Sequence, residues 1–262
     1  MTIHDMATWG GGAFIRFLLV FARCISMLVV LPVFSGHQLP PQVRLGLSAF
    51  LAYFIASALP NLDPIVAVPL FVVAILAQIG VGLLLGFLGS LVFAGIQFTG
   101  EIIDTQVGFA ITNVINPLNG TNVSILGQLQ LMLASLLFLA TDAHLLMLRG
   151  MADSFRVLPL PYAALNPALM HDVMLFFSTT LMLIFKIAAP IAVALLVTNV
   201  AMGFLARVAP QVNVFIVALP AQLGIGLVMF AFSLPIFGFV VPQLFRQLPV
   251  QFDAALRTMV VR

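Results

Sequence analysis

The chain has 262 residues, of which 63% are hydrophobic and 7% charged, and its mean hydropathy is +1.22. Soluble globular proteins carry charge on roughly a quarter of their residues, so this composition excludes a soluble fold and predicts a helical protein that crosses the membrane several times. The net charge is only +2 and no run of Lys and Arg occurs, which argues against binding of nucleic acid.

The length leaves room for about six or seven spans of ~20 residues with short connections. No soluble segment can be separated from either end, so we expect residues 1–262 to form a single membrane-embedded domain. Cys24 is the only cysteine, which excludes an intrachain disulfide. Residues 1–12 contain no Lys or Arg, so they lack the basic start of a cleavable signal peptide.

Residues 13–34 form the first apolar run, which is long enough to span a bilayer. Arg16 and Arg23 lie seven residues apart and therefore share one face of the predicted helix. Arg16 lies near the helix end, where its side chain can reach the interface, whereas Arg23 lies deeper. Arg23 is therefore the better candidate for a structural ion pair.

Residues 65–99 contain no charged residue, and as one helix they would be roughly 50 Å long against a hydrocarbon core of about 30 Å. We therefore expect this run to tilt, break or turn back. Gly82, Gly86 and Gly89 form a stripe at helical spacing, which allows another helix to approach closely. If the run turns back, the arginine-rich loops and the C-terminal tail from residue 243 all fall on the cytoplasmic side, and we prefer that arrangement.

Residues 100–122 are the longest departure from hydrophobic sequence in the first half of the chain. Glu101 and Asp104 share a face if the helix continues to them, whereas Asn116-Pro117 and the residues after it are typical of a loop. Lipid cannot satisfy the N–H and C=O groups of a loop, so non-helical backbone at membrane depth must be buried or line a water-filled cavity. The sequence thus predicts a loop inside a pathway.

Residues 125–148 form a further apolar run that includes Asp142 and His144. Side chains two positions apart do not face each other on a helix, so we expect a helix end here and not a paired site. A short amphipathic helix should follow, with Arg149, Asp153 and Arg156 on it.

Lys186 is the only lysine and lies inside the long apolar run 173–206. Such a residue is either functional or paired with an acid such as Asp104 or Asp142. The last apolar run, 214–241, is interrupted by Pro220 and Pro235.

Catalytic and cofactor-binding motifs are not found: the sequence has no nucleophile elbow, zinc-protease helix, phosphate loop or paired cysteines. We therefore predict no enzyme activity, no cofactor and no metal site. Two rival functions stay open. One is a self-contained secondary transporter for a small solute, with Lys186 or Asp142 at its site; the other is an intramembrane enzyme, for which no nucleophile and base can be named.

Several fragments in fixed order resemble the FliR family of flagellar protein-export components, whose injectisome counterparts are the SctT proteins. The resemblance covers nearly the whole chain. It rests on Arg23, Pro32, Phe34, Pro41, Arg44, Gly100-Glu101, Gly108-Phe109-Ala110, Asn116-Pro117, residues 136–139, His144-Leu145, Ser154-Phe155, Leu158-Pro159, residues 209–215 (with Pro210, Gln211, Asn213 and Phe215), Pro220, Gly224 and Gly226.

This resemblance implies long broken helices arranged in hairpins, as in a fusion of the FliP and FliQ folds. It also implies partners: one copy of the chain would join several copies of FliP-type and FliQ-type membrane proteins, with a FlhB-type protein packed against them. Together they would form a gated channel for unfolded proteins in the bacterial inner membrane, at the flagellar basal body. The central match favours a flagellar system over an injectisome.

The family's plug loop would correspond to residues 106–123, and Glu101 and Asp104 would anchor its stem, in ion pairs with Arg23 or Lys186. The plug residues so implied are Gln106, Gly108, Phe109, Ala110, Asn113, Asn116, Pro117, Asn119, Gly120 and Asn122. Two positions depart from the family pattern: Gln222 replaces a common lysine, and Asn116 replaces a common aspartate.

Overall fold

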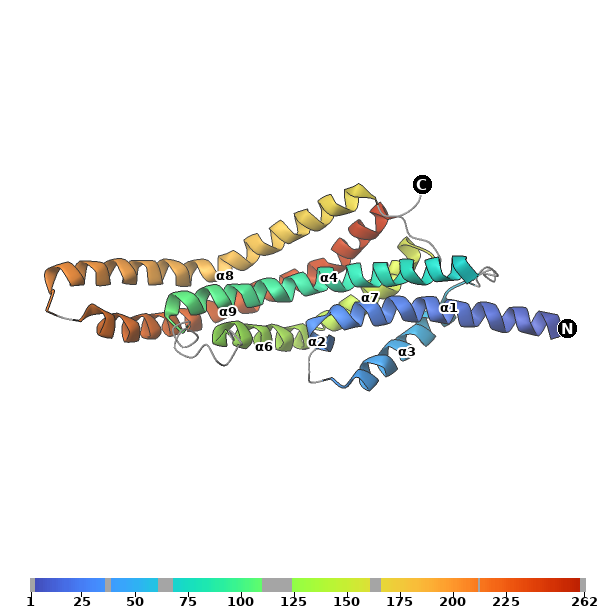
Figure 1. Ribbon diagram of the computed structural model, residues 1–262, viewed down its shortest axis with the longest axis horizontal. Coiled ribbons are helices and arrows are strands. Elements are labelled where there is room, and N and C mark those ends of the chain that lie inside the picture. Colours follow the sequence, from blue (N-terminus) through green and yellow to red (C-terminus); the bar gives the residue numbers. More distant parts are fainter. Residues whose placement is uncertain are drawn as a thin grey trace. The chain divides into compact units, whose positions relative to one another are not determined.

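The computed structural model describes residues 3–35, 39–60, 68–109, 124–160, 166–211 and 213–259, and every regular element within these ranges is a helix (Figure 1). The helices are α1 (Ile3–Val30), α2 (Pro32–Ser35), α3 (Pro41–Ala58), α4 (Val68–Val107), α6 (Ile125–Ala140), α7 (Ala143–Val157), α8 (Pro167–Val208) and α9 (Val214–Thr258). Four segments are long and apolar enough to cross a membrane: Gly12–Val30, Pro69–Val107, Pro167–Val208 and Ile216–Thr258. The predicted all-α integral membrane fold is confirmed.

Three helices are much longer than one span requires. α4 has 40 residues, α8 has 42 and α9 has 45, so each is about 60 Å long or more against a hydrocarbon core of about 30 Å. The prediction that residues 65–99 turn back is wrong, because α4 continues unbroken from Val68 and has no proline after its first turn. Without that turn, the charge distribution no longer predicts that the arginine-rich loops and the region from residue 243 share the cytoplasmic side.

The prolines of the C-terminal half also fail to interrupt their helices. Pro190 lies inside α8, and α9 continues past Pro220 and Pro235 to Thr258, through the region that we expected to be a tail. Proline is tolerated in long apolar helices when neighbouring groups take over the freed backbone carbonyls.

A break does occur between α6 and α7, whose axes bend by 70°. The N–H of Thr141 still bonds to the carbonyl of Leu137, but Asp142 adopts the left-handed region with φ +56° and ends the helix. The apolar run 125–148 is therefore divided between two helices, and the predicted helix end at Asp142 is confirmed. The amphipathic helix that we expected next is α7, on which Arg156 pairs with Asp153 at 3.1 Å.

The chain folds as two compact units, each built from separated stretches of sequence. Unit 1 contains residues 1–91, 144–176 and 246–262, and unit 2 contains residues 92–143 and 177–245. In unit 1, α1 packs against α2 and α3. Whether the chain is one functional domain stays a prediction.

The glycine stripe of α4 is where α1 approaches most closely in unit 1. A Cβ atom on Gly82 would overlap the Arg23 carbonyl, and one on Gly86 would lie 2.7 Å from the carbonyl oxygen of Met27. Only glycine fits at these positions, which confirms that the stripe permits close helix packing.

Arg23 of α1 is completely buried in unit 1 and binds neutral partners. Its Nε donates to Oε1 of Gln78 at 2.8 Å, Nη1 to Oγ of Ser154 at 3.0 Å, and Nη2 to the carbonyl of Leu158 at 3.2 Å. Its Cζ also lies 4.1 Å from the centre of the Phe155 ring. A single guanidinium thus joins α1, α4, α7 and the chain that follows α7, which its rigid fork of five donors allows.

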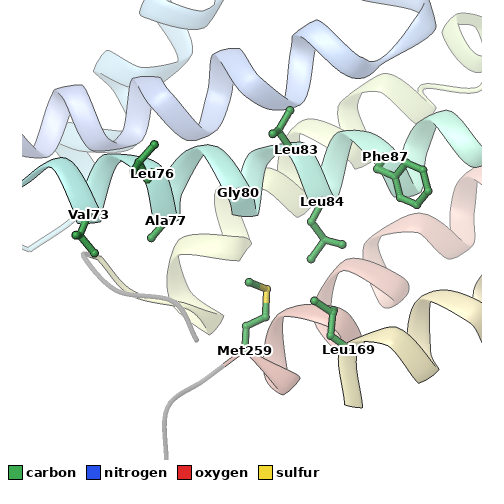
Figure 2. A pocket seen from close by; sticks show the side chains of 9 residues that line it. All are labelled: Val73, Leu76, Ala77, Gly80, Leu83, Leu84, Phe87, Leu169 and Met259. Carbon is green, nitrogen blue, oxygen red and sulfur yellow. The ribbon is translucent and has the colours of Figure 1, made fainter. Parts of the chain in front are cut away.

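An apolar pocket of about 560 Å³ lies along α4 in unit 1 (Figure 2). It extends from Val73 to Phe87 on α4 and is bounded by Leu169 and Met259. Every residue that lines it is apolar. A solute site needs a few polar groups that fix orientation, so this pocket gives no support to small-solute transport.

Replacement of Arg23 by Leu should strongly destabilise unit 1, because Gln78 and the Leu158 carbonyl would stay buried without their donor. We expect a loss of about 3 kcal/mol or more in the free energy of unfolding, and Arg23→Lys should also lose stability because one ammonium cannot replace the fork. The melting temperature of the chain in detergent measures both. Arg149→Leu, at an exposed position of α7, is the matched control and should have little effect. Equal melting temperatures for Arg23→Leu and Arg149→Leu would contradict the stabilising role of Arg23.

Candidate functional site at the junction of α4 and α6

Helix α4 ends at a glycine, Gly108. Gly108 has φ +99°, a conformation that side chains disfavour, and the amides of Gly108 and Phe109 both donate to the carbonyl of Asp104 at 3.1 Å. The bond from the Phe109 amide to the carbonyl five residues earlier is the 6→1 hydrogen bond of the Schellman motif, which commonly ends helices at glycine. The chain therefore leaves the helical path at Gly108.

The start of α6 is capped by two side chains. Oγ of Ser124 accepts from the amide of Gly127 at 2.8 Å, which is the usual N-cap bond. The carboxylate of Asp104, on α4, accepts from the amide of Leu126 at 3.1 Å and 3.3 Å to its two oxygens. An acid from another helix thus satisfies one of the first amides of α6, where the helix dipole also favours negative charge.

Two glycines bring α4 and α6 together one helical turn before this contact. A Cβ on Gly100 would lie 2.5 Å from the backbone nitrogen of Gly127. Without a side chain at either position the two backbones can cross closely, and this crossing places Asp104 within reach of Leu126.

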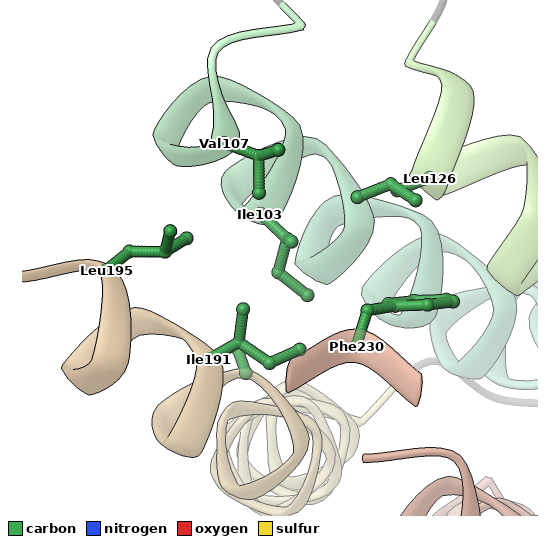
Figure 3. Packing of buried hydrophobic residues seen from close by; sticks show 7 residues of the cluster. Ile103, Val107, Leu126, Ile191, Leu195 and Phe230 are labelled. Carbon is green, nitrogen blue, oxygen red and sulfur yellow. The ribbon is translucent and has the colours of Figure 1, made fainter. Parts of the chain in front are cut away.

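Apolar side chains of unit 2 surround the junction (Figure 3). The buried cluster consists of Ile103, Val107, Leu126, Ala188, Ile191, Leu195 and Phe230, from α4, α6, α8 and α9, and Phe109 packs against it. Asp104 is itself only 5% exposed. Hydrogen bonds in such an apolar setting are stronger than in water, so the Asp104 contact is well placed to hold the two helices together.

A polar contact between α8 and α9 lies next to the helix stop. Nε2 of Gln222 donates to Oδ1 of Asn199, and Oε1 of Gln222 lies 3.8 Å from where a Cβ on Gly108 would be. The α8–α9 pair is thus a hairpin, as we expected, and the residue that replaces the family lysine faces the start of the predicted plug.

The predicted plug loop begins slightly later than we expected. Gln106 lies in the last turn of α4, so only Gly108 and Phe109 belong to the turn that follows it. The other plug residues lie outside the described residues and stay a prediction: Ala110, Asn113, Asn116, Pro117, Asn119, Gly120 and Asn122.

The expected ion pairs of the stem are wrong. Asp104 binds the backbone amide of Leu126 instead, and exposed Glu101 accepts a hydrogen bond from the side-chain Nε2 of Gln97 at 3.2 Å. Arg23 is satisfied by its neutral partners, and Lys186 is exposed. The ion pairs found in the described ranges are Arg156–Asp153, His171–Asp172 and Arg257–Asp253.

The family-motif residues lie around the turn between α8 and α9. Pro210, Gln211 and Asn213 follow the end of α8, and the amide of Ile216 donates to the carbonyl of Asn213 at 3.1 Å. Phe215 and Pro220 belong to the first two turns of α9.

Sequence reasoning missed Ser124 and Leu126. Ser124 stands directly before an apolar run, which is the usual signature of a helix start and could have been recognised. The partner of Leu126 comes from a different helix, and no sequence spacing indicates it. Within the described ranges no group of three His, Cys, Asp or Glu side chains could hold a metal ion.

The chain is similar to known proteins over most of its length. Residues 14–248 match the profile of the family described as bacterial export proteins, family 1. The flagellar biosynthetic protein FliR of Pectobacterium carotovorum subsp. carotovorum is 35% identical over 240 residues, which cover 88% of this chain and 87% of that relative. FliR of Bacillus subtilis (strain 168) is 30% identical over 235 residues, with 88% and 91% covered.

A relative from another kind of system is also similar. The Yop proteins translocation protein T of Yersinia pestis is 28% identical over 218 residues, which cover 80% of this chain and 82% of that protein. The match to the export-protein profile extends over nearly the whole sequence and includes both ends of the α4–α6 junction. The chain therefore belongs to the bacterial export proteins, family 1.

Proposed function

We propose that this chain is the FliR-type component of a bacterial flagellar export gate in the inner membrane. The observation that carries the proposal is the family match over residues 14–248 together with relatives named as flagellar biosynthetic protein FliR. Four helices long and apolar enough to cross a membrane support a place in the bilayer. The FliR proteins of Pectobacterium carotovorum and Bacillus subtilis, at 35% and 30% identity, are more similar to the chain than the Yersinia protein at 28%, which favours a flagellar system.

In the proposed gate, one copy of the chain joins several copies of FliP-type and FliQ-type membrane proteins, and a FlhB-type protein packs against them. The large apolar area that the chain exposes supports such an assembly: Phe204, Ile216, Phe232 and Phe239 of α8 and α9 are each at least 64% exposed. The gate conducts unfolded polypeptides, and the chain itself catalyses no reaction.

Residues 108–123 close the channel at rest. Two observations support this role: the segment begins at a helix stop with a positive φ at Gly108, and it rejoins the structure at an α6 start that is bound to α4. The segment has no charged residue, so it could leave an apolar constriction without exposing an unpaired charge.

A self-contained solute transporter is the rival function. It requires polar groups that converge on a site near the membrane midplane. The pocket in unit 1 has an entirely apolar lining, and Lys186 is exposed. These features favour the export gate.

The native mass of the detergent-extracted complex tests membership of a gate. When the tagged chain is purified from cells that also express the FliP-type and FliQ-type proteins, we expect one copy of it with several copies of each. Native mass spectrometry measures the composition directly. A monomer or a homo-oligomer of this chain under those conditions would sink the proposal.

Deletion of residues 108–122 from the assembled gate should let small ions leak across the membrane, because the closing segment is gone. Potassium chloride conductance of the gate in planar bilayers measures the leak. A variant with Asn116 and Asn119 changed to serine keeps the length of the segment and should stay tight. Unchanged conductance of the deletion variant, with the complex still assembled, would count against the closing role.

A further inference from the structure

Lys186 is a single charge on an otherwise apolar face of α8. It is exposed, and it is the only lysine in the chain. Met182, Val193 and Val197 lie four, seven and eleven residues from it, so they share its face of the helix. These three side chains are 65%, 59% and 63% exposed. This lysine face of α8 (Met182, Lys186, Val193 and Val197) therefore presents large apolar side chains with one ammonium group among them.

The exposed apolar surface of α8 is too long for lipid to cover together with the lysine. Exposed apolar side chains occur from Phe177 to Phe204, a stretch of about 40 Å, against a hydrocarbon core of about 30 Å. If α8 tilts so that the whole stretch lies in lipid, the ammonium of Lys186 lies in hydrocarbon. If Lys186 lies instead at the edge of the core, Phe177 and Met182 are left in water. Each arrangement leaves either the charge or apolar surface in the wrong solvent.

The chain does not neutralise this lysine itself. In the part of the chain that the structure describes, the ion pairs are Arg156–Asp153, His171–Asp172 and Arg257–Asp253, and none includes Lys186. An ammonium at membrane depth requires a counter-charge or water. Water would leave the neighbouring apolar side chains exposed, whereas a protein helix can cover them and supply a carboxylate at the same time.

We propose that the lysine face of α8 binds a membrane helix of a different protein in the gate, and that this helix is apolar except for one Asp or Glu, whose carboxylate pairs with Lys186. The inference rests on the proposed assembly of an export gate. It goes further because it names the face of α8 that is covered and the chemistry of the helix that covers it. Apolar packing is non-directional, so the charge pair would set the register between the two helices.

The single lysine allows a chemical test on the unaltered protein. A hydrophobic carbodiimide joins a carboxylate to an amine in contact with it, and Lys186 has the only side-chain amine of this chain. The wild-type gate, whose composition is verified by native mass, is treated in its membrane, and the cross-linked peptides are identified by mass spectrometry. We expect a link from Lys186 to an Asp or Glu of another protein of the gate. A link to an acid of this chain, or of a second copy of it, would overturn the proposal.

Three variants test whether the pair matters for assembly. Lys186→Met leaves the partner carboxylate buried without its cation, so the recovery of gate per tagged chain should fall about tenfold or more. Lys186→Arg keeps the charge and should recover most of the assembly. Arg149→Met removes one positive charge from an exposed position of α7 and should assemble as the wild type does.

Both results, the link and the loss of assembly in Lys186→Met, are required. If the wild-type gate forms but either result is missing, as expected for an ammonium that faces water or a lipid phosphate, the pairing is overturned and the export gate stands. If the wild-type chain forms no gate, the proposed function is overturned and the inference with it. Should Lys186→Met yield no folded chain, the link in the wild-type gate decides alone, and its absence overturns the pairing.

Discussion

Helix ends leave backbone N–H and C=O groups without an intrahelical partner, and at membrane depth protein must satisfy these groups because lipid offers no hydrogen bond. Charged side chains meet that requirement by binding backbone groups of other helices. Asp104 accepts an amide at the start of α6, while Arg16 donates to the carbonyl of Leu59 at the end of α3 and Arg23 to that of Leu158 just after α7. In each case the sign of the charge matches the helix dipole, with the anion at an N-terminus and the cations at C-termini.

This arrangement explains why the expected ion pairs do not form. A buried ion pair requires two charges to lose their hydration, and the cost of this desolvation can exceed their mutual attraction. A single charge that binds neutral polar groups removes fewer charges from water and can also satisfy backbone groups. Arg23 in unit 1 and Asp104 in unit 2 both follow this pattern, so charge acts in each unit as a hydrogen-bonding centre.

Much of the fold could be predicted from the sequence, because hydrophobic length and glycine spacing carry local information. The α-helical membrane fold, the glycine stripe at Gly82 and Gly86, and the helix end at Asp142 were all predictable on those grounds. The continuity of α4 and α9 was not. The long uncharged run in α4 suggests two passes when membrane thickness is the only guide, and the prolines and arginines of α9 suggest a break and a tail. The sequence could not indicate the partner of Asp104 either. This partner is a backbone amide, a group that every residue except proline carries, and it belongs to another helix.

The proposed closing role of residues 108–123 implies that the α4–α6 junction borders the path of an unfolded polypeptide. A photo-cross-linking amino acid in place of Phe109, in a complete gate that holds a stalled export substrate, tests it most directly. We expect cross-links between this position and the stalled polypeptide, and none from Phe14, an exposed aromatic residue of α1. Efficient cross-linking at Phe14 with none at Phe109, while the substrate remains stalled in the gate, would contradict it.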